Sequence, residues 1–424
     1  MKQCAFTICA KNYIGLAQVL ERSFRACNPG RDFYIFVADL PDRHTPALEP
    51  NVWIARDKLG LDGREWTELS FKYDLTEFCT AIKPLCFEYL FDAEGYGSAT
   101  YLDPDIYCFS SFDPVYARLE SHSIVLSPHI LTIEERYGGD LWENLFLWAG
   151  SYNLGFLALR NSGPARKLLR WWAGVLRDEC FVDNRRFTAT DQKWMVFAPM
   201  FFDASELHID RDMGIDAAPW NFYEREFFER EGRVWVRNRI DPAVEPTPLM
   251  FVHYSNYKYS ELLRGVVKHY NLKREYADLP LVFDPYVAAL RQGRMADFLP
   301  LEYSYNTFDD GTTISPLNRR IYRRLLVEGE APDNPFATVR GGFYDTLRKR
   351  KLLTRRNAVT TTVRGADAAP GGATRLLRVF DLGCQLLKGL MGVDRYERFI
   401  RFASSRLAPE NQTCLYDRKS RPNL

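Results

Sequence analysis

Strand-like and helix-like segments alternate along the first 260 or so residues, and this alternation constrains the fold more than any other feature. Residues 4–10 form a short apolar run with β-branched members, and residues 12–26 follow with apolar side chains at helical spacing. A continuous apolar run at residues 33–40 suits a strand covered on both faces, and it ends near an acid. Such alternation predicts an α/β sheet with helices on both of its faces.

The same pattern continues through the rest of these residues. A helix is predicted over residues 71–91 with an interruption near Pro84, and another over residues 165–180 with Pro164 in its first turn. Further strands are predicted at residues 99–109, 123–130, 152–160 and 249–253. Ligands of open α/β sheets bind outside the carboxyl ends of the strands, so the residues directly after each strand are the functional candidates.

The second part of the chain has a different hydrophobic pattern and composition. Short amphipathic helical patterns follow residue 260, and a stretch rich in Gly, Ala and Pro predicts a linker. We therefore expect an α/β domain at 1–260, a helical extension at 261–362, a linker at 363–375 and basic amphipathic helices at 376–424.

Charge is divided unequally between these parts. The net charge is +1, but the residues from Ser315 onward hold 22 Lys and Arg against 10 Asp and Glu, which leaves 34 against 45 in residues 1–314. The basic helices are interpreted either as a bundle with a solvated face or as helices that lie on an anionic membrane surface. The sequence contains no nucleic-acid-binding motif, so nucleic acid is not an expected partner.

Targeting and cysteine patterns suggest the compartment. No apolar run reaches the roughly 18 residues of a membrane-spanning helix, and the N-terminus lacks a signal-peptide pattern. Nine cysteines are scattered without a C-x-x-C pair, which indicates free thiols in a reducing compartment. We expect a cytoplasmic protein, with its basic region at the inner face of the membrane.

The most informative segment for chemistry is YLDPDI at residues 101–106. Asp103 and Asp105 follow an apolar strand, where paired acids are costly unless the site is open or holds a metal. Two carboxylates one residue apart can reach a hard divalent cation whose other positions are filled by diphosphate oxygens. An Asp-Pro-Asp turn is the alternative interpretation.

Two further segments offer polar groups at the ends of predicted elements. His253 ends the apolar run LMFVH, and with Asp103 and Asp105 it would complete a ligand set for Mn²⁺ or Mg²⁺; alone, it would be a hydrogen-bonded structural histidine. Asp191 and Gln192 begin a helical pattern, either as ordinary capping residues or as side chains directed at a sugar.

The joint order of several motifs is more specific than any one of them. Along residues 3–260 the chain contains TICAKNYIGLAQVLERSF, AIKPLCFEYLF, YLDPDIYCF, SYNLGFLALR, ATDQKWM, APWNFYERE and FVHYSNYK. This order resembles the family 8-like glycosyltransferases of GT-A fold, especially bacterial polysaccharide glycosyltransferases. One departure concerns the family's H-x-x-G-x-x-K element, which reads HYSNYK here, with Asn256 in the Gly position and Lys258 one residue early.

The resemblance implies a Rossmann-like nucleotide-sugar-binding domain followed by a mostly helical basic region. It implies a UDP-sugar donor, a saccharide or lipid-linked saccharide acceptor, transfer with retention, and a metal held by Asp103, Asp105 and His253. Asp191 and Gln192 would be catalytic residues that steady the reacting sugar. The implied nucleotide contacts are Thr7, Cys9, Ala10, Tyr13, Lys83 and Asp103, and the implied sugar or acceptor contacts are Asn153, Gly155, Trp220, Asn221, Asn256 and Lys258.

Two other classes of protein fit parts of the pattern. A metal-dependent phosphohydrolase could use the same Asp-Asp-His set, although it would usually have more acids around the ion. A non-enzymatic protein could bind a membrane or nucleic acid through the basic region. Among these classes, the glycosyltransferase accounts for the largest number of motifs.

Overall fold

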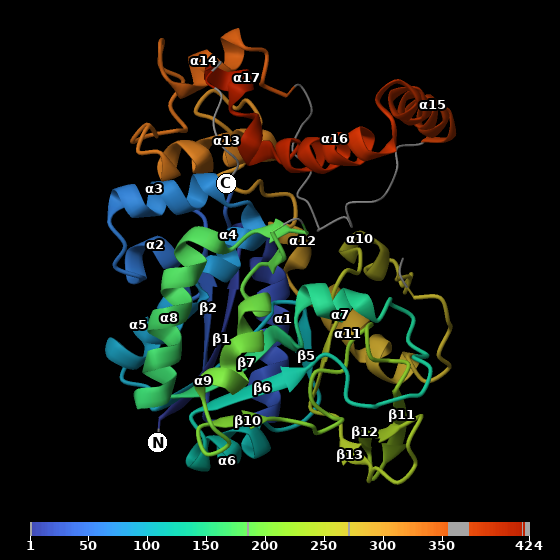
Figure 1. Ribbon diagram of the computed structural model, residues 1–424. Coiled ribbons are helices and arrows are strands. Elements are labelled where there is room, and N and C mark those ends of the chain that lie inside the picture. The colour runs from blue at the N-terminus through green and yellow to red at the C-terminus, as the bar shows by residue number, and fades with distance from the viewer. Residues whose placement is uncertain (1, 185, 270–271, 355–372, 418, 420–424) are drawn as a thin grey trace. The chain divides into compact units, whose positions relative to one another are not determined.

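The computed structural model describes residues 2–417 and 419, except 185, 270–271 and 355–372. The chain forms two compact units (Figure 1). The first consists of Met1–Asp62 and Leu75–Ser304, and the second of Gly63–Asp74 and Tyr305–Leu424. This division differs from the boundary expected at residue 260, because the segment up to Ser304 packs with the α/β core.

A seven-stranded sheet forms the centre of the first unit, in the order β10-β6-β7-β4-β1-β2-β3. Strand β7 runs antiparallel to both of its neighbours, and the other pairs are parallel. The strands are β1 (Gln3–Cys9), β2 (Asp32–Val37), β3 (Val52–Ile54), β4 (Ser98–Leu102), β6 (Ile124–Pro128), β7 (Tyr152–Arg160) and β10 (Leu207–Ile209). The predicted α/β fold is confirmed.

Helices cover both faces of this sheet. Because side chains alternate along a strand, Phe6 of β1 faces α5, where its ring lies 4.7 Å from that of Phe87, while Ala5 and Cys9 join the core on the α1 side. Figure 1 shows α5 and α8 on one side of the strands and α1 on the other. The covering helices are α1 (Ile14–Cys27), α5 (Lys83–Asp92), α6 (Asp113–Ser121) and α8 (Gly163–Glu179).

Residues 71–91, predicted as one interrupted helix, belong to three separate helices. They are α3 (Gly63–Lys72) in the second unit, and α4 (Leu75–Ala81) and α5 in the first. The break before α5 has the cause expected from the sequence, since Pro84 lies in the first turn of α5, where an N–H is not needed.

Short strands lie outside the main sheet. Strand β5 (Ile106–Cys108) pairs antiparallel with β14 (Phe251–His253), with His253 opposite Ile106. The remaining strands are β8 (Val182–Asp183), β9 (Thr188–Ala189), β11 (Arg225–Arg230), β12 (Arg233–Asn238) and β13 (Thr247–Pro248). The remaining helices of this unit are η1 (Lys11–Tyr13), α2 (Ala55–Lys58), α7 (Asn144–Ala149), η2 (Gln192–Phe197), α9 (Ala198–Phe201), α10 (Tyr259–Leu262), α11 (Pro280–Gln292) and α12 (Met295–Phe298).

The second unit is helical where the structure describes it. Arg319 ties its two chain segments together, since its guanidinium is buried and donates to the carbonyl oxygens of Phe71 and Tyr73 at 2.7 and 2.8 Å. The helices besides α3 are α13 (Pro316–Val327), α14 (Phe343–Lys349), α15 (Ala373–Met391), α16 (Val393–Arg406), η3 (Pro409–Gln412) and α17 (Cys414–Asp417). Most of the predicted linker at 363–375 lies outside the described residues, and its last three residues begin α15.

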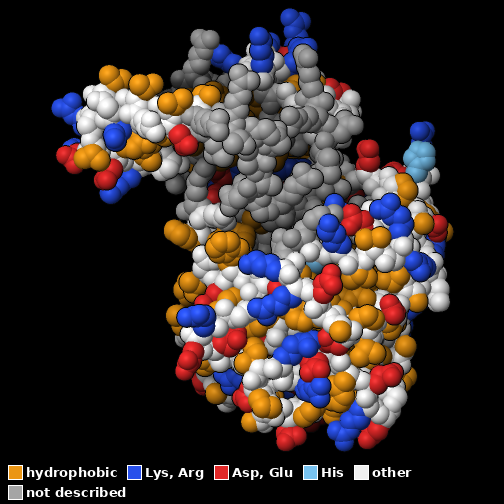
Figure 2. Space-filling view, turned by 90° about the vertical axis from the view of Figure 1, so that its right-hand side faces the viewer, with side chains coloured by type: hydrophobic (Ala, Val, Ile, Leu, Met, Phe, Trp, Pro, Cys, Tyr) orange, Lys and Arg blue, Asp and Glu red, His pale blue; other side chains and the backbone are white. Residues whose placement is uncertain are grey.

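Two surface properties bear on the sequence expectations. None of the helices formed by the described residues has the length and apolar character needed to cross a bilayer. On the face of the first unit that Figure 2 shows, acidic, basic and apolar side chains are interspersed, so this face carries no field of a single sign.

Candidate active site

Asp103, Asp105 and His253 come together at the carboxyl end of β4. Asp103 and Asp105 lie in the turn between β4 and β5, which is closed by a hydrogen bond from the Ile106 N–H to the Asp103 carbonyl oxygen at 3.1 Å. The pairing of β14 with β5 brings His253 to this turn, and the Tyr254 N–H donates to the Asp105 carbonyl oxygen at 2.9 Å. The turn that the sequence offered as an alternative is therefore present, and it presents both acids to one histidine.

The geometry of these three side chains suits a divalent cation. His253 Nε2 lies 3.0 Å from Asp105 Oδ1 and 3.6 Å from Asp103 Oδ2, and one ligand atom from each residue falls within 4.8 Å of the others. The carboxylates remain 29% and 21% exposed, whereas the imidazole is 4% exposed. Two oxygen donors and one imidazole nitrogen on an open edge fit Mn²⁺ or Mg²⁺.

Neighbouring polar groups fix the orientation of the His253 ring. Asn153 Oδ1 accepts a hydrogen bond from the Gly155 N–H at 3.0 Å, and His253 Nδ1 lies 3.3 Å from the same oxygen. Because this oxygen is an acceptor, it suits a His253 ring protonated at Nδ1, with Nε2 directed at the carboxylates. Gly155 is required for close packing here, since a Cβ atom would lie 2.5 Å from His253 Cε1.

Opposing effects act on the charges of the cluster. Burial by itself would lower the pKa of His253, but Asp105, Asp216 and Asp103 raise it well above its ordinary value. Burial raises the pKa of Asp103, although Lys83 and His253 act in the opposite direction. The cluster therefore favours a positive charge between its members, and a metal cation would compete with the His253 proton for that place.

A buried ion pair lies next to the cluster. Lys83 Nζ is 2.5 Å from Asp191 Oδ2, donates to the Leu154 carbonyl oxygen at 2.8 Å, and lies 4.0 Å from the centre of the Tyr101 ring. The Tyr101 hydroxyl in turn donates to Asp103 Oδ1 at 2.6 Å. Direct contacts thus connect Asp191 with the proposed metal ligand Asp103.

This pair argues against the capping interpretation of Asp191. The residue directly precedes η2, but its side chain makes no capping hydrogen bond. Its carboxylate is bound instead by Lys83 and by the Thr190 hydroxyl, which donates at 3.2 Å. Gln192 is partly buried at the start of η2, and a contact of either side chain with a sugar stays a prediction.

Four of the predicted nucleotide residues lie in β1 or directly after it: Thr7 and Cys9 belong to the strand, and Ala10 and Tyr13 follow it. Thr7, Cys9 and Ala10 are buried, with exposed fractions of at most 3%. Tyr13 is partly buried, and its pKa is raised by burial and by the charge of Asp105, which places it near the cluster. Their contacts with a nucleotide remain predictions.

Asp39, which follows β2, has a role that the sequence analysis missed. Its carboxylate accepts hydrogen bonds from the N–H groups of Lys11 and Ser304 at 2.8 and 3.0 Å. Lys11 Nζ donates to Asp42 Oδ2 at 2.9 Å, so the loops after β1 and β2 are held together. The acid at the end of the second predicted strand was the available signal, but its partners are distant in sequence.

The predicted sugar and acceptor residues are only partly brought together. Trp220 is 8% exposed, and its ring packs edge to face against His253 at 5.3 Å and His129 at 5.5 Å. Asn221 Nδ2 donates to the carbonyl oxygens of His129 and Asp216, both at 3.0 Å. The Asn221 side chain therefore holds together two backbone segments next to the site.

The last two predicted sugar or acceptor residues follow β14. Asn256 adopts a left-handed conformation with φ of 64°, which Asn and Gly tolerate best. The Lys258 side chain is 55% exposed and lies 3.6 Å from Glu261. Neither residue has a contact with the Asp103, Asp105 and His253 cluster among the interactions described.

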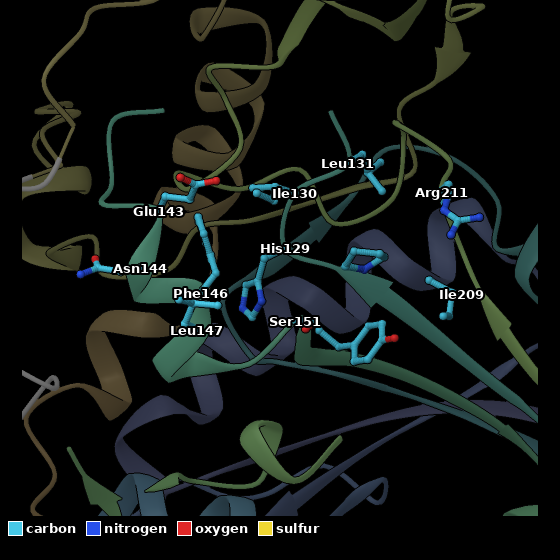
Figure 3. A pocket seen from close by; sticks show the side chains of 12 residues that line it. His129, Ile130, Leu131, Glu143, Asn144, Phe146, Leu147, Ser151, Ile209 and Arg211 are labelled. Carbon is cyan, nitrogen blue, oxygen red and sulfur yellow. The ribbon is translucent and has the colours of Figure 1, made fainter. Parts of the chain in front are cut away.

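A cleft of about 700 Å³ lies beside this region, at the carboxyl ends of β6 and β10 (Figure 3). His129 lines it and also packs against Trp220, which contacts His253. Burial lowers the pKa of His129 to about 4, so the ring is neutral near pH 7. The other lining residues are Pro128, Ile130, Leu131, Glu143, Asn144, Phe146, Leu147, Ser151, Tyr152, Ile209 and Arg211.

Comparison with known proteins gives a similarity of fold. No family model matches the chain. A curated relative, the uncharacterized protein YfnD of Bacillus subtilis (strain 168), is 23% identical over 271 residues, which cover 62% of this chain and 80% of that protein.

Solved structures similar to the chain are glycosyltransferases of the GT-A type. They include the galactosyltransferase LgtC in complex with donor and acceptor sugar analogs (13% identity, 68% of this chain and 95% of that chain, TM-score 0.41). They also include GlyE of Streptococcus pneumoniae TIGR4, which is 12% identical, covers 72% of this chain and 67% of its own, and has a TM-score of 0.33. Mouse xyloside xylosyltransferase 1 is 11% identical, covers 51% of this chain and 88% of its own, and has a TM-score of 0.32. Since these TM-scores lie below 0.5, the geometry of the site carries the functional argument.

Proposed function

We propose that the protein is a metal-dependent glycosyltransferase, which moves a sugar from a nucleotide-sugar donor to a saccharide acceptor. The observation that carries the proposal is the cluster of Asp103, Asp105 and His253 at the carboxyl end of β4, where open α/β sheets bind their ligands. These donors suit Mn²⁺ or Mg²⁺, and cations of this kind bind the oxygens of a diphosphate.

The chemistry required is the departure of a diphosphate from the anomeric carbon. A bound divalent cation would neutralise the negative charge that develops on this leaving group. The protein supplies rigid positioning: Tyr101 holds the Asp103 carboxylate, and Lys83 holds Asp191 at 2.5 Å. Groups fixed in this way before the reaction stabilise developing charge without first having to reorganise.

The donor and the stereochemistry are finer parts of the proposal. We propose a UDP-sugar and transfer with retention, which the motif order of a family 8-like enzyme supports. Because Lys83 neutralises the Asp191 carboxylate in a buried pair, we assign Asp191 to stabilisation of the sugar rather than to covalent attack. Gln192 would contact the same sugar from the start of η2.

We propose the cleft beside Trp220 for the acceptor. The rings of Phe146 and Tyr152 can stack on sugar faces, and Glu143, Asn144 and Arg211 can bind hydroxyl groups. A lipid-linked saccharide of surface polysaccharide synthesis would satisfy both the polar and the apolar lining. A phosphohydrolase is not favoured, because the cluster found among the described residues contains only two acids.

The second unit supports a proposal of peripheral attachment to the inner membrane surface. Four apolar side chains of α15 have exposed fractions of 58–84%: Val379, Leu382, Leu386 and Leu390. Their spacing of three and four residues places them on one face of the helix. Exposed arginines of α16 accompany this apolar face, in the part of the chain with the basic excess. Apolar side chains combined with cations are typical of helices that lie on anionic lipid.

A thermal-shift and transfer experiment tests the enzymatic proposal. UDP with Mn²⁺ should raise the melting temperature of the wild-type protein, and chelation of the metal should remove the shift. Asp105→Asn should reduce the Mn²⁺-dependent shift and lower sugar transfer by at least about 100-fold, since the removed charge is a metal ligand. Asp113→Asn is the control, because Asp113 is an exposed acid paired with Arg31. Transfer that persists at the wild-type rate with chelator present would contradict the proposal.

A further inference from the structure

The carboxylate of Asp216 is the least explained polar group near the proposed metal ligands. It is 0% exposed, and neither of its oxygens has a hydrogen-bond partner among the described residues. A buried carboxylate without partners is costly, so its presence requires a compensating interaction. Its backbone is also unusual, because φ is 57°, a left-handed value that is uncommon for residues other than Gly, although Asn and Asp adopt it more often than most.

The nearest basic side chain to this carboxylate is the imidazole of His253, and the buried guanidinium of Arg225 also interacts with it electrostatically. Asp216 Oδ1 lies 3.8 Å from His253 Nδ1, on the side of the ring opposite Nε2, which faces Asp103 and Asp105. The distance is too long for a hydrogen bond, but in a buried position it gives a strong electrostatic interaction. Asn153 Oδ1, at 3.3 Å, supplies the hydrogen bond to the same nitrogen.

The surrounding structure holds Asp216 in this place. The Asn221 side chain donates to the Asp216 carbonyl oxygen at 3.0 Å, and the His253 N–H donates to the Ala217 carbonyl oxygen at 2.8 Å. These contacts fix the left-handed residue directly beside β14. The carboxylate thus has a fixed position relative to the histidine although it forms no hydrogen bond of its own.

We propose that Asp216 is a positioning residue that, together with Asn153, keeps the Nδ1 proton of His253 in place so that Nε2 is presented to a divalent cation. A carboxylate behind a ligating histidine fixes its tautomer and raises the basicity of the other nitrogen. The inference rests on the proposed metal role of His253, but it concerns metal affinity and ring tautomer, which do not depend on the reaction catalysed.

The first test measures Mn²⁺ binding by titration calorimetry or electron paramagnetic resonance. Asp216→Asn should weaken Mn²⁺ binding roughly 10- to 100-fold, the range typical of such supporting residues. A melting curve recorded in parallel shows whether Asp216→Asn is folded under the conditions of the titration. Asp210→Asn is the matched control: Asp210 is also buried, but it pairs with Arg118 at 3.0 Å and has no described contact with His253. Mn²⁺ affinity of Asp216→Asn within twofold of the wild type would overturn the proposal.

A second measurement examines the protonation of His253 in the wild-type protein itself. Proton–nitrogen correlation spectra of the imidazoles should show His253 protonated at Nδ1 when the ring is neutral, with the signal assigned by its loss in His253→Gln. The chain has six histidines, so the spectrum is tractable. A neutral ring protonated at Nε2 would overturn the proposal. Absence of sugar transfer with both results as expected would instead contradict only the proposed glycosyltransferase function.

Discussion

At the scale of single residues, charge and its burial determine what the site can do. Asp103 and Asp105 were recognisable from the sequence because two acids after an apolar strand need an open or occupied site. Asp216 carried no comparable signal, since the histidine that gives it a role is brought to it by folding. Lys83 was implied only by the motif order, and its partner Asp191 is distant in sequence.

The Lys83 and Asp191 pair gives a prediction about stability. Both side chains are buried, at 1% and 4% exposed, so Lys83→Met leaves an uncompensated buried carboxylate. We expect a loss of about 3–5 kcal/mol in the free energy of unfolding, measured by urea denaturation. The pair of Arg166 and Asp92 is 22% and 66% exposed, so Arg166→Met should cost about 1 kcal/mol or less. Equal costs for the two variants would contradict this account.

His129 gives a prediction about pH. Its pKa in the folded protein is about 4, below the unfolded value near 6.5, because burial disfavours the charged ring. As pH falls below 6.5, the unfolded chain binds the proton first, so the contribution of His129 to stability is complete above 6.5 and is lost as pH falls through 4. The difference in unfolding free energy between wild type and His129→Gln should therefore shrink by up to about 3 kcal/mol from pH 7 to pH 4. A difference that does not change over this range would show that the ring is not held neutral.

At the scale of elements, the sequence predicted where most strands and helices lie but not how they pair. A strand at residues 249–253 was expected and β14 forms there, yet its antiparallel pairing with β5 was not expected, and this pairing brings His253 to Asp105. Hydrophobic periodicity reports which face of an element is buried, whereas the partner of that face depends on the whole chain. The segment at 71–91 shows the same limit, because its apolar pattern continues through three helices of two units.

Glycines in two helices give a prediction about close packing. A Cβ atom at Gly15 of α1 would lie 2.5 Å from the Met295 Cα atom of α12, so the backbones approach too closely for any side chain. Gly15→Ala should lower the free energy of unfolding by about 1–3 kcal/mol, because one helix must shift. Gly174 in α8 has open space around it, and Gly174→Ala should raise stability by up to about 1 kcal/mol through helix propensity. Thermal and urea unfolding of both variants would show whether their changes in unfolding free energy have opposite signs. Stabilisation by Gly15→Ala would contradict the close packing of α1 and α12.

At the scale of the whole molecule, the division into two units separates the α/β site from a helical unit with a basic sequence. The sequence indicated this second part through its charge, but it set the boundary near residue 260, whereas the first unit continues to Ser304. Helices α11 and α12 account for the difference, since their buried side chains, such as Phe283 and Leu290, pack with β14 and α1 residues in one core.

Vesicle flotation tests the proposed membrane attachment of the second unit. The protein should float with anionic vesicles at low salt and less at high salt, because each basic residue near the surface contributes about 1 kcal/mol and salt screens it. Leu390→Asp should abolish flotation, since Leu390 is 84% exposed on the apolar face of α15. Gln385→Asp makes the same charge change on the polar face of that helix and should retain most of the binding. Equal failure of the wild type to float with anionic and neutral vesicles would contradict attachment.

The sequence by itself determined the α/β class, the position of most elements, the paired acids after β4 and the basic character of the last hundred or so residues. These properties depend on local periodicity and composition, which a single chain displays directly. The tertiary structure decided which distant groups meet: His253 with Asp105, Lys83 with Asp191, and Asp216 with the far side of the His253 ring. Such contacts join residues separated by 37 to 148 positions in the chain, and they form only when the burial of the whole core fixes the strand pairing.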